Sequence, residues 1–271
     1  MGKELGWDRY IVRPDTAIRL NQIPTGETSL CTDKQQARKL LKQYVRQIDE
    51  LLDTFAIEEK RSLLVILQGM DASGKDGAIR KVFTGVNPLH CRATSFKQPD
   101  AVEKSHDYLW RIYAVLPARG QLAIFNRSQY EDVVVAAARE KHSPELIRMR
   151  LREIADVERI WAENGTVIRK FFLHVSAEEQ KRRLQARLDN PDKHWKLDES
   201  DFSDRRLWPR FQHIYQEALS RTSTDYAPWY IIPADHKWYR NIAIAATVLS
   251  TLRSLRPRLP HPAVDRSRFQ L

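Results

Sequence analysis

The chain has 271 residues, of which 42% are hydrophobic, and this length suits one large core or one domain with an appended subdomain. No run approaches the roughly 18 consecutive apolar residues of a membrane helix, and the N-terminal MGKELGWDRYIVRPD lacks the apolar segment of a secretory signal, so a cytoplasmic protein without membrane contact is predicted. Cys31 and Cys91 are too few for a disulfide framework or a zinc site, and the eight His show no metal-ligand spacing.

The charge balance is basic. The 45 Lys and Arg exceed the 35 Asp and Glu and give a net charge of +10. Such an excess favours a polyanionic partner, which could be nucleic acid, an anionic lipid surface or a phosphate-rich substrate. A soluble surface that is merely basic is the alternative, and charge alone does not choose among these.

The N-terminal part predicts an arm followed by a long helix. Residues 1–31 carry prolines and a glycine without any period, so an irregular arm is expected. Thr32 or Asp33 can cap a helix whose apolar positions continue at helical spacing as far as Phe55.

The rest of the chain alternates between strand and helix patterns. Short apolar runs predict strands at Leu63–Leu67, Cys91–Phe96, Leu122–Phe125, Val167–His174 and Trp229–Ile232. Helical patterns lie at about residues 76–83, 100–116, 144–163, 177–189, 204–221 and 237–255. This alternation predicts an α/β three-layer sandwich with a parallel sheet, in one domain spanning residues 1–271, with an irregular proline-rich tail from residue 256.

The strongest local motif follows the first of these strands. Gly69, Gly74 and Lys75 have the spacing G-x-x-x-x-G-K of a phosphate-binding loop between a buried strand and a helix. In such a loop the backbone N–H groups, here including those of Ala72 and Ser73, face an anion, and the helix dipole and the lysine add positive charge. A chance match in a strand–helix turn is the alternative.

Two carboxylates accompany this loop. Asp71 lies inside it, and Asp76 stands where a Ser or Thr hydroxyl normally reaches magnesium. A carboxylate beside bound phosphates must be offset by a cation or turned away, and Mg²⁺ can bridge carboxylate and phosphate oxygens. We therefore expect Asp71 to hold the metal or to orient an acceptor phosphate. Asp76 could complete the metal shell or simply complement the helix dipole.

The segment QLAIFNRSQYEDVVV supplies a second candidate group. Its strand ends at Asn126 and Arg127, where P-loop enzymes usually carry an Asp near magnesium. An Asn can hold a metal-bound water without adding charge, and Arg127 would emerge at the carboxyl edge of the sheet, where a guanidinium can grip phosphate oxygens. Glu131 and Asp132 follow, and at least one could be an ordinary acid at a helix start.

A third segment, SAEEQKRRLQARLDNPDKHWKLDESDF, is rich in basic residues. Ser176 and Glu179 form a capping-box pattern, and Arg183 and Arg187 are four residues apart on one helix face. A solvated basic face is the ordinary interpretation. The alternative is a lid helix that brings arginines over transferring phosphates.

Five motifs in order carry a resemblance to a known family. GMDASGKDGAIRKVF, SFKQPD, IFNRSQYEDV, LHVSAEEQKRRLQARLDNPDKHWKLDESD and APWYIIPADHKWYRN together resemble the polyphosphate kinase 2 family, from about residue 32 to about residue 255. The resemblance implies a P-loop kinase fold with a helical lid at about residues 177–210. It also implies magnesium-dependent, reversible transfer of the terminal phosphoryl group of inorganic polyphosphate to ADP and AMP.

The resemblance also implies site residues. Asp71 corresponds to a catalytic carboxylate near the acceptor phosphate, and Lys75, Arg127 and Arg183 to phosphate-binding positions. The SFKQPD motif and the lid add candidates for nucleotide or phosphate binding, which with the loop positions are Gly69, Ala72, Ser73, Gly74, Lys75, Asp76, Lys97, Arg127 and Arg187.

One departure places the chain within the family. Many members read F-D-R-S-W-Y where this chain reads FNRSQY, a variant that resembles the subgroup acting on both nucleoside mono- and diphosphates. Asn126 in place of Asp puts the metal role of that position in doubt, and Asp132 is a candidate replacement. The expected metal ligands are thus Asp71, Asn126 and Asp132. The expected partners are adenine nucleotides, and guanine nucleotides stay open. A homo-oligomer that does not bind nucleic acid is also expected.

Two rival functions stay open on the residues alone, and nucleic-acid binding is disfavoured. An ATP-dependent nucleoside or small-molecule kinase would share the loop and the lid and differ only in its donor. A P-loop switch protein would normally keep the Ser or Thr after the lysine. A nucleic-acid binder would place aromatic residues among its base-contacting cations, whereas the Trp residues here lie in apolar or lid contexts.

Overall fold

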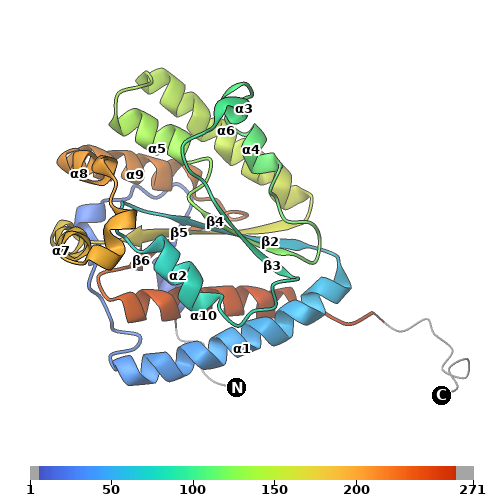
Figure 1. Cartoon of the computed structure of the whole chain (residues 1–271). Coiled ribbons are helices and arrows are strands. Elements are labelled where there is room, and N and C mark those ends of the chain that lie inside the picture. Colours follow the sequence, from blue (N-terminus) through green and yellow to red (C-terminus); the bar gives the residue numbers. More distant parts are fainter. Residues whose placement is uncertain (1–5, 261–271) are drawn as a thin grey trace, which may run out of the picture.

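A computed structural model describes residues 6–260, apart from the side chain at position 196. One six-stranded sheet has the order β1-β6-β5-β2-β4-β3, and all its pairings are parallel except that of β1 with β6 (Figure 1). The strands are β1 Ile11–Val12, β2 Ser62–Gln68, β3 Cys91–Ser95, β4 Leu122–Asn126, β5 Thr166–His174 and β6 Trp229–Pro233.

The five predicted strands are confirmed, and together they form the parallel part of the sheet. Every residue of β2, β4 and β6 is buried, because helices cover both faces of a parallel sheet and its central strands therefore need continuous apolar runs. The arm is less irregular than expected, since it contains two 3-10 helices, η1 Trp7–Tyr10 and η2 Leu20–Gln22, and the edge strand β1. Of the tail predicted to be irregular, residues 256–260 form no helix or strand and the remainder lies outside the described residues.

Helices form a layer on each side of the sheet (Figure 1). One layer contains α1 Lys34–Glu58, α2 Lys75–Val82 and α10 Lys237–Leu255, which pack against one another. The other contains α5 Glu131–Ala138, α6 Pro144–Glu163 and α9 Trp208–Thr222. The three-layer α/β sandwich is therefore confirmed.

Several predicted helices match the structure, and two do not. Asp33 caps α1 by accepting the Gln35 N–H at 2.8 Å, and α6 and α10 have their predicted bounds. The prediction of one continuous helix at 100–116 is wrong. It is broken into α3 Ala101–Lys104 and α4 Trp110–Tyr113, because a capping box at Asp100 and Glu103 starts one turn and Asp107 starts another by accepting the Leu109 N–H.

The helix expected at 204–221 is also divided. It consists of α8 Glu199–Arg206 and α9, with the boundary at Leu207, because Pro209 suits only the first turn of a new helix. The helix α5 was not predicted, since its apolar residues show little helical period.

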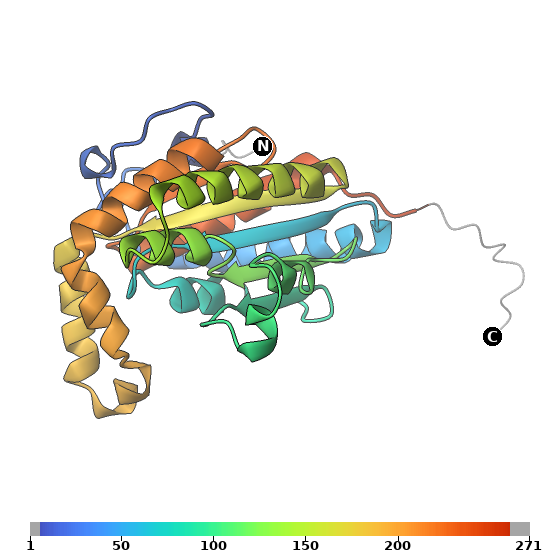
Figure 2. The same ribbon diagram turned by 90° about the horizontal axis from the view of Figure 1, so that it is seen from above.

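Together α7 Ala177–Leu188, η3 Pro191–Lys196 and α8 project at one end of the molecule (Figure 2). We call residues 177–206 the lid segment. No described helix is long and apolar enough to cross a membrane.

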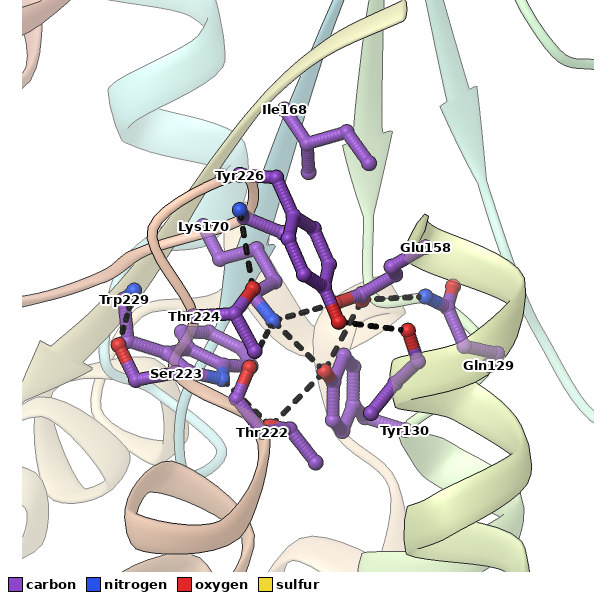
Figure 3. A network of polar contacts seen from close by, with 12 residues as sticks. Gln129, Tyr130, Glu158, Ile168, Lys170, Thr222, Ser223, Thr224, Tyr226 and Trp229 are labelled. Carbon is purple, nitrogen blue, oxygen red and sulfur yellow. Dashed lines mark hydrogen bonds and ion pairs between the residues drawn. The ribbon is translucent and has the colours of Figure 1, made fainter. Parts of the chain in front are cut away.

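A polar network crosses the core between β5 and the helices α5, α6 and α9 (Figure 3). The Lys170 ammonium donates to Glu158 Oε2 at 2.5 Å, to the Tyr130 hydroxyl at 3.0 Å and to the Thr222 carbonyl at 2.6 Å. Glu158 Oε1 accepts from Gln129 at 3.0 Å and from the Tyr130 hydroxyl at 2.9 Å. Lys170 and Glu158 are both fully buried, so this ion pair is held by hydrogen bonds instead of water.

Candidate functional site

A cavity of about 2550 Å³ opens at the carboxyl ends of the parallel strands. Ligands of open α/β sheets bind at this edge, because the turns after the strands meet there. All the site residues expected from the sequence line the cavity except one: Gly69, Asp71, Ala72, Gly74, Lys75, Asp76, Lys97, Asn126, Arg127, Asp132, Arg183 and Arg187.

Ser73 is the exception. Its hydroxyl is buried and has no hydrogen-bond partner among the described residues, and its N–H donates to the Met70 carbonyl at 3.1 Å. The side chain therefore does not reach the cavity, and the N–H closes a turn within the loop instead of being free for an anion.

The phosphate loop adopts a tight conformation that places its lysine underneath it. Gly69 and Gly74 have φ values of +146° and +101°, which favour glycine. The Lys75 ammonium donates to the carbonyls of Gly69 at 2.7 Å and Met70 at 3.3 Å. Burial and repulsion by Arg127 lower the pKa of Lys75, although nearby carboxylates oppose this. An anion above the loop would favour the charged form.

The inner carboxylate of the loop is paired with an arginine. Asp71 Oδ1 accepts from Arg127 Nη2 at 2.9 Å, and Arg127 Nε lies 3.6 Å from Glu131 Oε2. Burial alone would lower the pKa of Arg127, but attraction by Glu131 and Asp71 outweighs it and raises the pKa. Arg127 has φ +65°, a strained backbone for a residue other than glycine, which directs its side chain across the loop. Part of the negative charge in the cradle is thus offset by the protein itself.

The second loop carboxylate meets the end of β4. Asn126 donates through Nδ2 to Asp76 Oδ1 at 2.6 Å, and its own Oδ1 is buried without a partner among the described residues. Mg²⁺ is usually held in kinases by one or two oxygen ligands and by substrate phosphates. The orphaned amide oxygen next to Asp76, in the cavity that Asp71 also lines, fits such an ion. The part of the chain that the structure describes has no cluster of three or more His, Cys, Asp or Glu for a metal held by protein alone.

Asp132 lines the same cavity as the other expected metal ligands and is paired with an arginine. Its carboxylate accepts from Arg111 at 3.0 Å, and Arg111 also donates to the Lys97 carbonyl at 2.9 Å. The expectation that Asp132 replaces an acidic residue at position 126 stays a prediction, and a metal there would compete with Arg111 for this carboxylate. Through Arg111, Asp132 at the start of α5 is linked to the Lys97 carbonyl in the segment after β3. These contacts do not involve the Lys97 ammonium.

The two lid arginines occupy different positions. Ser176 caps α7 by accepting the Glu179 N–H at 3.1 Å, but the Glu179 carboxylate pairs with Arg183 at 2.6 Å instead of completing the capping box. Arg183 is buried and lies against the loop backbone. Arg187 is more exposed and pairs with Asp201 at 2.8 Å. Burial and repulsion by Asp71 raise the pKa of Asp201 to about 6.

Sequence reasoning missed two groups of cavity residues. The first is Arg240, whose guanidinium lies against Gly74 and which was quoted only as a letter of the motif APWYIIPADHKWYRN. The second is a row of exposed cations on α1 with a spacing of four residues, which could have been found from that spacing: Lys34, Arg38, Lys42 and Arg46. We call these four residues the basic row.

Comparisons with known proteins identify the family of this chain. The family model described as Polyphosphate kinase 2 (PPK2) matches residues 31–259. An AMP/ADP-polyphosphate phosphotransferase of Meiothermus ruber is 45% identical, over 94% of this chain and 96% of that protein. An ADP-polyphosphate phosphotransferase of Rhodopseudomonas palustris is 36% identical, over 90% of this chain and 88% of that protein.

A solved structure agrees as well. The crystal structure of polyphosphate kinase 2 from Arthrobacter aurescens superposes with a TM-score of 0.89 at 36% identity, covering 92% of this chain and 90% of that chain. The range 31–259 of the family model includes the phosphate loop, the strand end at Asn126 and the lid segment. The chain belongs to the polyphosphate kinase 2 family.

Proposed function

We propose that this protein transfers the terminal phosphoryl group of inorganic polyphosphate to ADP and AMP, reversibly and with Mg²⁺. One observation carries the choice of donor. The cavity continues from the phosphate loop along the basic row of α1 and past Arg80 and Lys81 of α2. A linear polyanion lying along these cations would place one end at the loop, whereas a nucleoside triphosphate is too short to use the whole row.

Phosphoryl transfer needs positioning and charge stabilisation more than covalent groups. Lys75 and the N–H groups of the loop would bind phosphate oxygens. Arg127 is held by Asp71 and Glu131 so that its remaining N–H groups can contact the transferring group. Asp71 would orient the acceptor phosphate or the metal.

The metal would bind on the acidic side of this cradle. Asn126 Oδ1 and the carboxylates of Asp76 and Asp71 would supply its protein oxygen ligands. When bound, Mg²⁺ would supply positive charge that neutralises part of the phosphate charge during transfer. Without it, the carboxylates of Asp71 and Asp76 would face the substrates' negative charge, offset in part by Arg127 and Lys75.

The lid segment would close over the reacting groups. Arg187 lines the cavity from α7, and its one ion pair within residues 6–260 is with Asp201, so it can exchange this carboxylate for a phosphate. Excluding water from the transferring phosphoryl group would favour transfer over hydrolysis.

Acceptor choice and assembly complete the proposal. The Meiothermus ruber relative is named for AMP and ADP, and the Rhodopseudomonas palustris relative for ADP alone. We propose that this chain uses both, with guanine nucleotides as a further acceptor to be tested, and that it works in the cytoplasm as a homo-oligomer.

A purified-protein assay tests the function. Protein with ADP, long-chain polyphosphate and Mg²⁺ should form ATP, protein with AMP should form ADP more slowly, and chelation of the metal should abolish both. Activity with ATP and a nucleoside or another small acceptor, but none with polyphosphate, would instead assign an ATP-dependent kinase. Light scattering on the same sample measures the oligomeric state.

A further inference from the structure

Two guanidinium groups converge on one carbonyl of the phosphate loop. Arg183 Nη1 donates to the Ser73 carbonyl at 2.9 Å, and Arg240 Nη1 donates to the same oxygen at 3.1 Å. Arg183 comes from α7 and Arg240 from α10, so two helices distant in the sequence meet at this peptide.

Arg183 uses all of its donors within the protein. A guanidinium has five N–H groups, and each has an acceptor here: Glu179 Oε1 and the carbonyls of Ala72, Ser73, Ala234 and Asp235. In this arrangement no N–H remains for a phosphate. Arg183 joins the loop to the segment after β6 and does not extend over the opening.

Arg240 is a buried cation without a carboxylate partner among the described residues. It is 2% exposed, and its Nε and Nη2 donate to Asn241 Oδ1 at 3.1 and 2.8 Å. Burial and repulsion by Arg183 lower the pKa of Arg240 to about 9. Burying a charge in this way costs stability, and an apolar side chain of similar length would avoid that cost.

The guanidinium also touches the loop directly. A Cβ atom added at Gly74 would lie 1.9 Å from Arg240 Nη1 and 3.0 Å from its Cζ. In a trans peptide the carbonyl and the following N–H point in opposite directions. Fixing the Ser73 carbonyl on the two guanidinium groups therefore turns the Gly74 N–H away from them.

We propose that Arg183 and Arg240 are positioning residues that lock the Ser73–Gly74 peptide so that the Gly74 N–H faces the bound phosphate. This inference rests on the proposed function and gives Arg183 a different task from the direct phosphate contact expected from the sequence. It assigns to Arg240 a role in turnover that acts only through the loop.

Arg240→Met tests the proposal, because it removes the guanidinium that bonds Ser73 and Asn241 and also removes the buried charge. A misplacement of about 1 Å in a catalytic group can cost about 10²-fold in rate, so kcat with ADP and polyphosphate should fall about 10²-fold. Thermal stability should stay equal or rise. Arg240→Lys keeps the charge but cannot bond Ser73 and Asn241 in the same fork, so it should recover only part of the loss.

Arg169→Met is the matched control. Arg169 donates to the Ile168 carbonyl at 2.7 Å and to Thr251 of the same helix α10 at 3.0 Å. Thr251 lies about 16 Å along the helix axis from position 240. This variant should keep a normal kcat.

Two outcomes would overturn the proposal. One is a normal kcat in Arg240→Met, and the other is a loss that matches the fraction of unfolded protein or is shared by Arg169→Met. If the wild type itself transfers nothing from polyphosphate, the proposed function fails separately. The positioning of the Ser73–Gly74 peptide is then tested by calorimetry with inorganic tripolyphosphate. Arg240→Met should weaken the binding of tripolyphosphate about tenfold, and Arg169→Met should leave it unchanged. Unchanged binding in both variants would reject the proposal.

Discussion

At the scale of single residues, Asp71 joins the two sides of the cradle, since it lies in the phosphate loop and pairs with Arg127 at 2.9 Å. Asp71→Asn keeps the shape and can still accept from Arg127, but it removes the charge. Turnover should fall at least ~10²-fold, the scale of a positioned catalytic group. Nucleotide should bind equally well or more tightly, because a repulsive charge is gone. Steady-state kcat beside a calorimetric Kd measures this.

Asp76→Asn is the comparison for that variant. Asp76 lies in the first turn of α2 and accepts from Asn126. If it mainly complements the helix dipole, its charge contributes only about 0.3–1 kcal/mol, and turnover should fall less than in Asp71→Asn. A normal kcat in Asp71→Asn would mean that the inner carboxylate is structural.

The sequence predicted the loop because its information is local. Gly69, Gly74 and Lys75 are fixed by a spacing that can be read in one segment. The partners of Asp132 and Arg183 are not local. Arg111 reaches Asp132 from a helix whose bounds were mispredicted, and Arg183 reaches Ser73 across 110 residues. Contacts of this kind depend on packing that no spacing encodes, so the roles of these side chains could not be predicted.

At the scale of elements, the network in Figure 3 ties β5 to three helices through one buried ion pair. Lys170→Met should destabilise the protein by about 3–5 kcal/mol, because it leaves the Glu158 carboxylate buried without its cation. The double variant Lys170→Met/Glu158→Gln removes both charges and should recover most of the loss. Urea unfolding of the two variants measures the difference; a double variant no more stable than the single one would contradict this account.

The contact of His174 with the N-terminal arm should make the free energy of unfolding depend on pH. His174 Nε2 lies 3.0 Å from the Leu20 carbonyl, and Nδ1 is buried without a partner among the described residues. Burial lowers the pKa of His174 below its ordinary 6.5, although the two arm carbonyls and Asp235 oppose this. A depressed folded-state pKa means that the stability contributed by the neutral ring is fully present above pH 6.5 and is lost as the pH falls through the folded-state value.

His174→Gln checks this dependence, since a Gln amide can donate to the Leu20 carbonyl but does not titrate. The free energy of unfolding of the wild type should fall relative to the variant as the pH is lowered from 8 toward 5. Parallel curves for the two proteins would show that the arm is not held by a neutral histidine.

Helix boundaries show where local patterns lose their value. The period of α6 and the cap of α1 are local features, and both were predicted. The short helices α3 and α4 are held by Asp100 and Asp107 against a segment that has no period of its own. The helix α5 is apolar on nearly every side because it packs against both α6 and α9, so its pattern resembles a buried strand.

At the scale of the whole molecule, the net charge of +10 is partly explained by one cavity, because the basic row and the α2 cations line it. If the four residues of the basic row each contact a phosphate, counterion release should raise the KM for long polyphosphate about 50-fold between about 50 and 200 mM salt. The KM for ADP should change much less, since a nucleotide is too short to contact the whole row. Both constants can be measured at fixed free Mg²⁺.

A variant separates this effect from general screening of the charged surface. Arg38→Gln with Lys42→Gln removes two cations from the middle of the row, which are exposed and carry no other contact that the fold needs. The slope of log KM for polyphosphate against log salt should then fall by about 1.4, or about 0.7 for each lost contact. A matched pair on the opposite surface, Arg148→Gln with Arg159→Gln, should leave the slope unchanged, because these arginines do not line the cavity. Equal slopes in all three proteins would place the donor elsewhere and would remove the observation on which the choice of polyphosphate depends.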